Sequence, residues 1–304
     1  MIALAQKPTV KSRDRLQIGP VTVHRLADME DIAWPVAAIF RDLTGSDLRE
    51  AADRYPGCAE PQAARLLLSF NSYIVDMPGC LCLIDCGIGN GKERPDRPLW
   101  HRRDGDFMQR LDSLGYAADR FDLVVNTHLH ADHVGWNTTA TADGWTPTFK
   151  NARYVVPQSE LALWQRLAAQ HPDGHVLHGA FADSVQPLLD AGIYQAVVLP
   201  SEIAPGLWLE PAPGHTPGMA VVRLKLPQGG VLFLADVLHS PLQLAAPELT
   251  SNFCADPAQA SATRHRLLAE CAQSNAIVAT YHFPPPVFGH VVTSGAGYRF
   301  EPLM

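Results

Sequence analysis

Residues 127–136, which read T-H-L-H-A-D-H-V-G-W, place three imidazoles and a carboxylate within a span of six residues. Neutral imidazole nitrogens and carboxylate oxygens are the ligands that zinc and similar divalent ions take in proteins. Any one of these histidines alone would be read as a surface residue. Packing does not explain four such side chains together, because buried polar groups need partners. The segment therefore predicts a metal site built from His128, His130, Asp132 and His133.

The apolar run before these residues explains how they are positioned. Residues 121–128 (FDLVVNTH) read as a short buried strand. Side chains alternate along a strand, so an H-x-H pair at its end directs both rings to the same side. His128 and His130 can then bind one ion, while Asp132 and His133 in the following turn can face a second.

The rest of the chain alternates between short strands and helices. Strands dominate without a strict alternation of strand and helix, which favours a mixed α/β layered fold over a barrel or a Rossmann sheet. The first sixty residues are irregular apart from one strand. We expect strands over residues 21–26, 65–76, 80–87, 121–128, 153–156, 207–210, 221–226, 231–234 and 277–280, and helices over residues 106–114, 159–170, 184–189 and 257–273.

The composition is that of a globular protein that binds neither nucleic acid nor a membrane. The chain has 304 residues, of which 47% are hydrophobic and 18% charged. Its formal net charge is −7 without any block of Lys or Arg, whereas nucleic-acid binding draws much of its affinity from phosphate neutralisation. The N-terminal apolar run is too short for a secretory signal, and no run approaches the roughly 18 apolar residues of a membrane-spanning helix.

The cysteines fit a reducing compartment. Three of the six lie in the strand-like segment GCLCLIDCG, and a zinc knuckle would need a second paired cluster that the sequence lacks. We interpret them as reduced, buried thiols and expect a cytoplasmic protein. They are Cys58, Cys80, Cys82, Cys86, Cys254 and Cys271.

The pattern H-x-H-x-D-H after a strand resembles the signature of the metallo-β-lactamase superfamily. Four further motifs follow the order of that family, so the resemblance extends over residues 66–291. It implies a four-layer αβ/βα sandwich with the metals at one edge of two facing sheets. The further motifs are LIDCG at 83–87, PGHTPG at 213–218, FLADV at 233–237 and YHFPPPVFGHV at 281–291.

This resemblance implies a ligand set for two divalent metal ions. Zinc is the expected metal, although manganese, iron, cobalt or nickel could occupy the same ligands. In the family, the acid of the first motif, here Asp85, orients the ligand loop and does not bind metal. The implied assignment is His128, His130 and His215 on one ion, Asp132, His133 and His282 on the other, and Asp236 shared between them.

Within the superfamily, the stretch of residues 282–290 resembles the lactonase and methyl-parathion-hydrolase branch. The resemblance implies a hydrolase that attacks a lactone, ester or phosphotriester carrying an apolar group, with a metal-bridging hydroxide as nucleophile. Asp132 is the candidate catalytic residue, orienting that nucleophile and moving a proton. Two alternatives stay open, which are a hydrolytic dehalogenase of an activated aromatic and a metal-bearing sensor or binding protein without turnover.

The substrate is expected to be a small molecule in an apolar pocket with a few polar groups. Candidate walls are residues that flank metal ligands or lie in the N-terminal part of the chain. We predict that the pocket is lined by Phe40, Trp136, His239, Phe283 and Phe288. In contrast, we expect His171, His175 and His178 to lie in a solvated loop, and His290 to brace the fold.

We expect two parts of the chain, an N-terminal extension over residues 1–64 packed on a catalytic domain over residues 65–304. The extension holds Trp34, Ile39 and Phe40, which must bury somewhere. It is therefore expected to act as a lid or as a dimer contact, and the protein is expected to be a homodimer.

Overall fold

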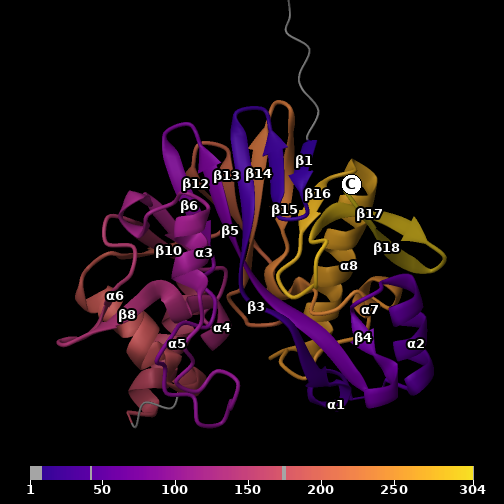
Figure 1. The fold of residues 1–304 in the computed structure, drawn as a ribbon, viewed down its shortest axis with the longest axis horizontal. Helices are drawn as coiled ribbons and strands as arrows, with labels where there is room; N and C mark the ends of the chain where they lie inside the picture. The colour runs from indigo at the N-terminus through magenta and orange to yellow at the C-terminus, as the bar shows by residue number, and fades with distance from the viewer. Residues whose placement is uncertain (1–8, 42, 173–175, 304) are drawn as a thin grey trace, which may run out of the picture.

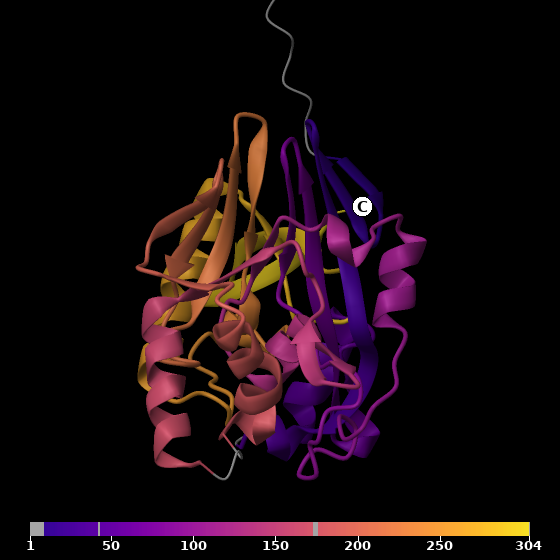
Figure 2. The same cartoon turned by 90° about the vertical axis from the view of Figure 1, so that its left-hand side faces the viewer.

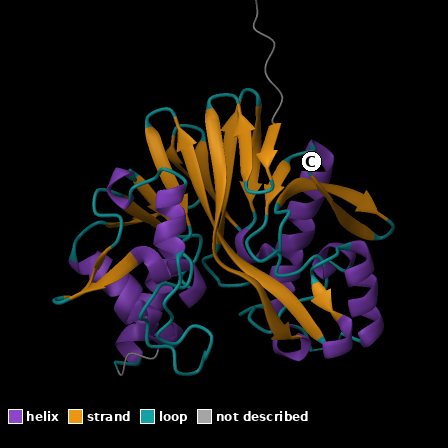
Figure 3. Cartoon of the chain, in the orientation of Figure 1, coloured by secondary structure: helices purple, strands orange, loops and turns teal. Residues whose placement is uncertain are grey.

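The computed structural model describes residues 9–41, 43–172 and 176–303, and two large β-sheets dominate it (Figures 1 and 3). In the first sheet the strand order is β1-β2-β3-β5-β6-β7-β10-β11, with β4 also paired to β5. These strands are β1 (Thr9–Ser12), β2 (Arg15–Ile18), β3 (Val21–Pro35), β4 (Ala59–Glu60), β5 (Arg65–Met77), β6 (Cys80–Ile84), β7 (Leu123–Val125), β10 (Arg153–Pro157) and β11 (Tyr194–Val197).

The second sheet runs in sequence order from β12 to β18, and a separate hairpin joins β8 (Thr138–Thr141) to β9 (Gly144–Pro147). Within the second sheet, only β15 and β16 pair in parallel. Its strands are β12 (Ser201–Ala204), β13 (Leu207–Pro211), β14 (Ala220–Leu226), β15 (Gly229–Phe233), β16 (Ile277–Ala279), β17 (Phe288–Ser294) and β18 (Gly297–Pro302).

The two sheets pack face to face with helices on their outer surfaces, as Figure 2 shows from the side. Strand β7 illustrates the layering, because Leu123 and Val125 enter the core between the sheets while Val124 packs on the helix side. The helices are α1 (Val36–Ile39), α2 (Gly45–Arg54), α3 (Phe107–Ser113), α4 (Ala131–Val134), α5 (Gln158–Gln170), α6 (Gln186–Asp190), α7 (Leu242–Ala245) and α8 (Pro257–Ser274). This arrangement confirms the predicted αβ/βα sandwich.

The N-terminal part of the chain is built into the first sheet. Strand β3 pairs antiparallel with β5 along its whole length, from Thr22 opposite Asp76 to Pro35 opposite Arg65. The expected boundary between residues 64 and 65 therefore separates β4 from β5, two strands that pair with each other. The described strands of the expected extension are thus part of the first sheet, and residues 1–8 and 42 lie outside the description.

Two of the three apolar residues that were expected to need burial, Ile39 and Phe40, are buried by their own chain, whereas Trp34 is half-buried. Ile39 and Phe40 are only 0% and 1% exposed, in a cluster that also holds Leu66 and Leu68 of β5. The need to bury them gives no support to a dimer contact, and the homodimer stays a prediction. Among the described residues, no helix is both long enough and apolar enough to cross a membrane.

Candidate metal centre

Four loops at one edge of the sandwich bring the predicted ligands together. His128 and His130 follow β7, α4 carries Asp132 and His133, and the other three residues follow β13, β15 and β16. The structure places their ligand atoms in compact groups, with all atoms of a group within 4.8 Å of one another. One group is His128, His130, His215 and Asp236, and another is Asp132, His133 and His282.

Asp85 ties the ligand loop to the end of β6. It is buried and has a left-handed φ of 56°, a conformation that aspartate tolerates better than most residues. Its carboxylate accepts hydrogen bonds from the backbone N–H of Thr127 at 2.8 Å and from the Thr127 hydroxyl at 2.8 Å. The same carboxylate lies 2.9 Å from Nδ1 of His133. These contacts are those expected of a residue that orients the loop.

Gly135 allows the ligand loop to approach the neighbouring loop closely. A Cβ atom at this position would lie 1.9 Å from the backbone carbonyl carbon of Ile88. The two loops also exchange backbone hydrogen bonds, because the N–H of Cys86 donates to His133 and the N–H of Trp136 donates to Cys86. Only glycine fits at position 135 with this backbone path.

The imidazole rings are held by their outer nitrogens, so that the inner ones face the centre. Nδ1 of His128 lies 3.1 Å from the Thr127 hydroxyl, and Nδ1 of His282 lies 3.2 Å from the Ser69 carbonyl. Among the described residues, no well-aligned hydrogen bond reaches the buried Nε2 atoms of His128 and His133 or Oδ1 of Asp236, although the last two atoms lie 3.1 Å apart. Such atoms destabilise a fold by about 1–3 kcal/mol each unless a partner satisfies them. Metal cations at this place would do so, and the donor set fits them.

Asp236 lies between the two groups of side chains. Its Oδ2 is 3.1 Å from Nε2 of His215, and its Oδ1 is 3.1 Å from Nε2 of His133. Nε2 of His282 is 3.3 Å from both oxygens. One carboxylate oxygen therefore faces each group, which is the arrangement that a carboxylate shared by two ions needs.

The electrostatics of the cluster also suit a cation. Burial lowers the pKa of His130 to about 4, and it lowers the pKa of His128 and His215 well below their usual value, so these rings stay neutral at pH 7. Burial would also lower the pKa of His133, but the charges of nearby carboxylates, led by Asp236, raise it well above its usual value. The surroundings of His133 thus favour positive charge, which a divalent ion provides.

Glu160 is a positioning residue that sequence reasoning missed. It lies in the first turn of α5 and is fully buried. Its carboxylate accepts hydrogen bonds from the N–H of Leu129 at 3.1 Å, the Thr216 hydroxyl at 2.7 Å and the N–H of Gly218 at 3.2 Å. It thereby links the loop of His130 to the loop of His215. No local motif marks a glutamate that acts across two distant loops.

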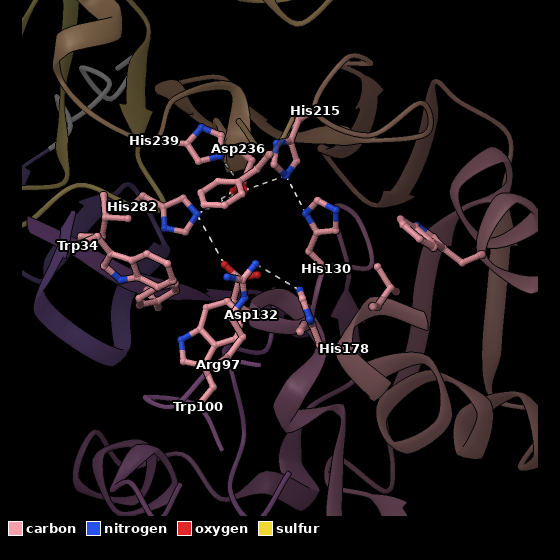
Figure 4. A pocket seen from close by; sticks show the side chains of 16 residues that line it. Trp34, Arg97, Trp100, His130, Asp132, His178, His215, Asp236, His239 and His282 are labelled. Atoms are coloured by element: carbon pink, nitrogen blue, oxygen red, sulfur yellow. Dashed lines mark hydrogen bonds and ion pairs between the residues drawn. The ribbon is translucent and has the colours of Figure 1, made fainter. Parts of the chain in front are cut away.

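A cavity of about 340 Å³ opens above this cluster. Figure 4 shows His130, Asp132, His215, Asp236, His239 and His282 around one end of it. The apolar part of the wall comes from segments far apart in the sequence. These residues include Trp34, Leu68, Phe70, Trp100, Trp164, Leu177 and Phe253.

Four of the five residues predicted to line the pocket pack elsewhere. Trp136 stacks on Phe107 on the helix side of the first sheet, with ring centroids 5.3 Å apart. The other three belong to clusters between the sheets, under α8 and beside β5. They are Phe288 against Tyr73, Phe283 against Phe300, and Phe40 among the apolar residues near Leu66.

The remaining predicted wall residue, His239, does lie in the cavity. Its ring stacks parallel on that of His282 at 5.3 Å, and its Nε2 is 3.4 Å from Oδ2 of Asp236. His178 also lines the cavity, which corrects its assignment to a solvated loop, whereas His171 is exposed. His175 lies outside the described residues. Nδ1 of His290 lies 3.2 Å from the Ala276 carbonyl, a contact that suits a bracing role.

Sequence comparisons point to one family. A family model for the metallo-beta-lactamase superfamily matches residues 67–282. Curated relatives include an N-acyl homoserine lactonase of a Bacillus species, 27% identical over 124 residues, which are 41% of this chain and 41% of the relative. An N-acyl homoserine lactonase of Bacillus thuringiensis matches with the same identity and coverage. The matched part is thus less than half of either relative.

Solved structures share the fold over almost the whole chain. The hydrolase AbOPH of the beta lactamase superfamily has a TM-score of 0.80 at 24% identity, with 96% of this chain and 97% of that chain covered. AidC, a dizinc quorum-quenching lactonase, has a TM-score of 0.76 at 20% identity, with 97% of each chain covered. Since the family model spans most of the chain, this protein belongs to the metallo-beta-lactamase superfamily.

Proposed function

We propose that this protein is a dinuclear metal-dependent hydrolase of lactones, esters or phosphotriesters that carry an apolar group, with zinc as the expected metal. The observation that carries this proposal is the position of Asp236, whose two oxygens face separate groups of imidazoles at 3.1 Å. The lactonase names among the relatives support the lactone as a first substrate class to test.

The residues of the site divide the work of hydrolysis. Bound in these two groups, a pair of divalent ions would supply an activated water and polarise the oxygen of the electrophile. The side chain of Asp132 is 12% exposed, compared with 4% for those of Asp236 and His282, and its backbone carbonyl accepts a hydrogen bond from Tyr281. Asp132 can therefore accept a hydrogen bond from the attacking water, take its proton and pass it to the leaving oxygen as the bond to that oxygen breaks.

The cavity wall supports an apolar substrate. Trp100 packs against both Trp34 and Phe70, with its ring centroid 6.0 Å from that of Trp34 and 5.8 Å from that of Phe70. Phe70 also contacts His282 edge to face at 5.2 Å. An acyl or aryl group on this surface would hold its electrophilic carbon or phosphorus next to Asp132, and we assign His239 to the same substrate-binding wall.

A substrate panel tests the proposal. We expect the zinc-loaded protein to turn over at least one of an N-acyl homoserine lactone, an aryl lactone, an aryl ester and an aryl phosphotriester. A chelator should abolish this turnover and added zinc should restore it. His290→Gln, a change outside the cavity, should keep the activity. Turnover of a chloroaromatic alone would point to a dehalogenase, and a protein with two bound metals that turns over none of these would contradict the proposal.

The homodimer is part of the proposal and is tested separately. We expect the mass in solution at micromolar concentration to be twice that of one chain, which is 33.1 kDa. A monomeric mass at that concentration would refute it, without bearing on the chemistry of the site.

A further inference from the structure

A single arginine side chain enters the apolar wall of the cavity. Arg97 lies between Trp100 and His178, and Figure 4 shows it directed into the pocket. Its Nη2 is 3.4 Å from Nε2 of His178, and its guanidinium carbon is 5.8 Å from the ring centroid of Trp100. Its Nε is buried without a hydrogen-bond partner among the described residues.

The neighbouring arginines of the same segment are all neutralised, which sets Arg97 apart. Arg94 pairs with Asp183 at 2.6 Å, Arg102 with Glu93 at 2.6 Å, and Arg103 with Asp28 at 2.7 Å. Within the described residues, Arg97 makes no such ion pair, and its only side-chain polar contact is the imidazole of His178. The pKa of His178 is lowered mainly by burial and also by the positive charge of Arg97. The ring therefore stays neutral and does not compete with Arg97 for an anion.

The segment that carries Arg97 is firmly anchored. The N–H of Arg97 donates to the carbonyl of Arg94, whose guanidinium is fully buried on Asp183, and the N–H of Trp100 donates to the carbonyl of Arg97. The guanidinium is therefore presented to the cavity from a fixed backbone. A partly desolvated cation that has no counter-charge among the described residues gains most from an anionic ligand.

The charge of the loaded site points the same way. Two dications, the carboxylates of Asp132 and Asp236 and a hydroxide leave about one positive charge, and Arg97 adds a second. Trp34, Trp100 and Trp164 line the same cavity with apolar surface, and Trp100 is the one beside Arg97. We propose that Arg97 binds a carboxylate carried on the apolar arm of the substrate, so that the preferred substrates are anionic esters or lactones. This inference rests on the proposed function and narrows its substrate class.

A matched pair of esters tests the inference. We compare para-nitrophenyl pentanoate, which is neutral, with the para-nitrophenyl half-ester of pentanedioic acid, which has the same chain length and a terminal carboxylate. Hydrogen bonds to charged groups are worth about 1.5–3 kcal/mol, so Arg97→Met should lower kcat/KM for the half-ester by about 10- to 100-fold. The value for the neutral ester should change by less than about threefold. Arg97→Lys should recover part of the preference, and high salt should weaken it.

Arg102→Met is the matched control, because Arg102 lies on the same segment but is exposed and paired with Glu93. It should leave both kcat/KM values unchanged. An equal loss on both esters in Arg97→Met, or no loss on either, would overturn the assignment of Arg97 to a carboxylate.

A binding measurement separates this inference from the proposed function. Tryptophan fluorescence should report the binding of 5-phenylpentanoate and of its neutral amide to the metal-loaded protein, since three tryptophans line the cavity. If neither ester is hydrolysed, the proposed function fails for esters. Arg97→Met should nevertheless weaken the binding of 5-phenylpentanoate by about tenfold and leave the binding of the amide unchanged. Equal affinity of the unmodified protein and of Arg97→Met for 5-phenylpentanoate would contradict the inference.

Discussion

Asp132→Asn is expected to lower kcat by about 10²- to 10⁴-fold, the range by which a positioned acid or base accelerates proton transfer. Asn keeps an oxygen that can bind metal but cannot take a proton from the attacking water. The loss should therefore appear in kcat at saturating metal. The measurement is steady-state kinetics on the best substrate of the panel, with metal content determined on the same sample.

Asp85→Asn is the control for this variant. Asp85 holds Thr127 and His133 from behind and lies away from the cavity lining. Outer contacts of this kind typically affect metal affinity by about 10–100-fold, so excess metal should restore much of the activity of this variant. Excess metal should not rescue Asp132→Asn. An unchanged kcat in fully loaded Asp132→Asn would remove Asp132 from the proton-transfer role.

Asp183→Ala is expected to lower the free energy of unfolding by about 3–5 kcal/mol, because it strips the buried guanidinium of Arg94 of its counter-charge. The Asp183 carboxylate accepts hydrogen bonds from both Nη atoms of Arg94, at 2.6 and 2.8 Å. Its Oδ1 also lies 3.6 Å from Nζ of Lys92. Both side chains are fully buried, and burial lowers the pKa of Lys92 to about 7. The measurement is the denaturant midpoint with its slope at pH 7.

Asp106→Ala removes an ion pair of a different kind. Its partner, Arg110, lies one helical turn away and both side chains are exposed, so this change should cost less than about 1 kcal/mol. A similar, small effect of Asp183→Ala would show that Lys92 and Arg94 are stabilised by other contacts. Since this segment carries Arg97, Asp183→Ala should also weaken binding of the carboxylate ligand.

The metal centre could be predicted from the sequence because its information is local. His128, His130, Asp132 and His133 lie in one short segment, and the strand periodicity before them fixes where the segment begins. The further motifs at His215, Asp236 and His282 each follow a strand with a clear apolar run. Loops after such strands converge on one edge once the sheets face each other, but these three residues can be assigned to the metals only through the resemblance of their motifs to the family.

The cavity could not be predicted in the same way, because its wall is assembled across the fold. Trp34 comes from the end of β3 and contacts Phe253, which follows α7, at a centroid distance of 6.4 Å. Sequence proximity to a ligand misplaced Trp136 and Phe283, because both of these side chains point into the supporting core. Strands away from the ligand motifs also escaped prediction, among them β1, β12, β17 and β18.

The central claim is that the two groups of side chains meeting at Asp236 bind two metal ions that hydrolysis requires. Titration of the metal-free protein with zinc, followed by metal analysis and by turnover of the best substrate, tests it most directly. Activity should rise until two zinc ions are bound per chain and then level off. Full activity in the metal-free protein would contradict the claim. So would activity that levels off although these residues bind no metal.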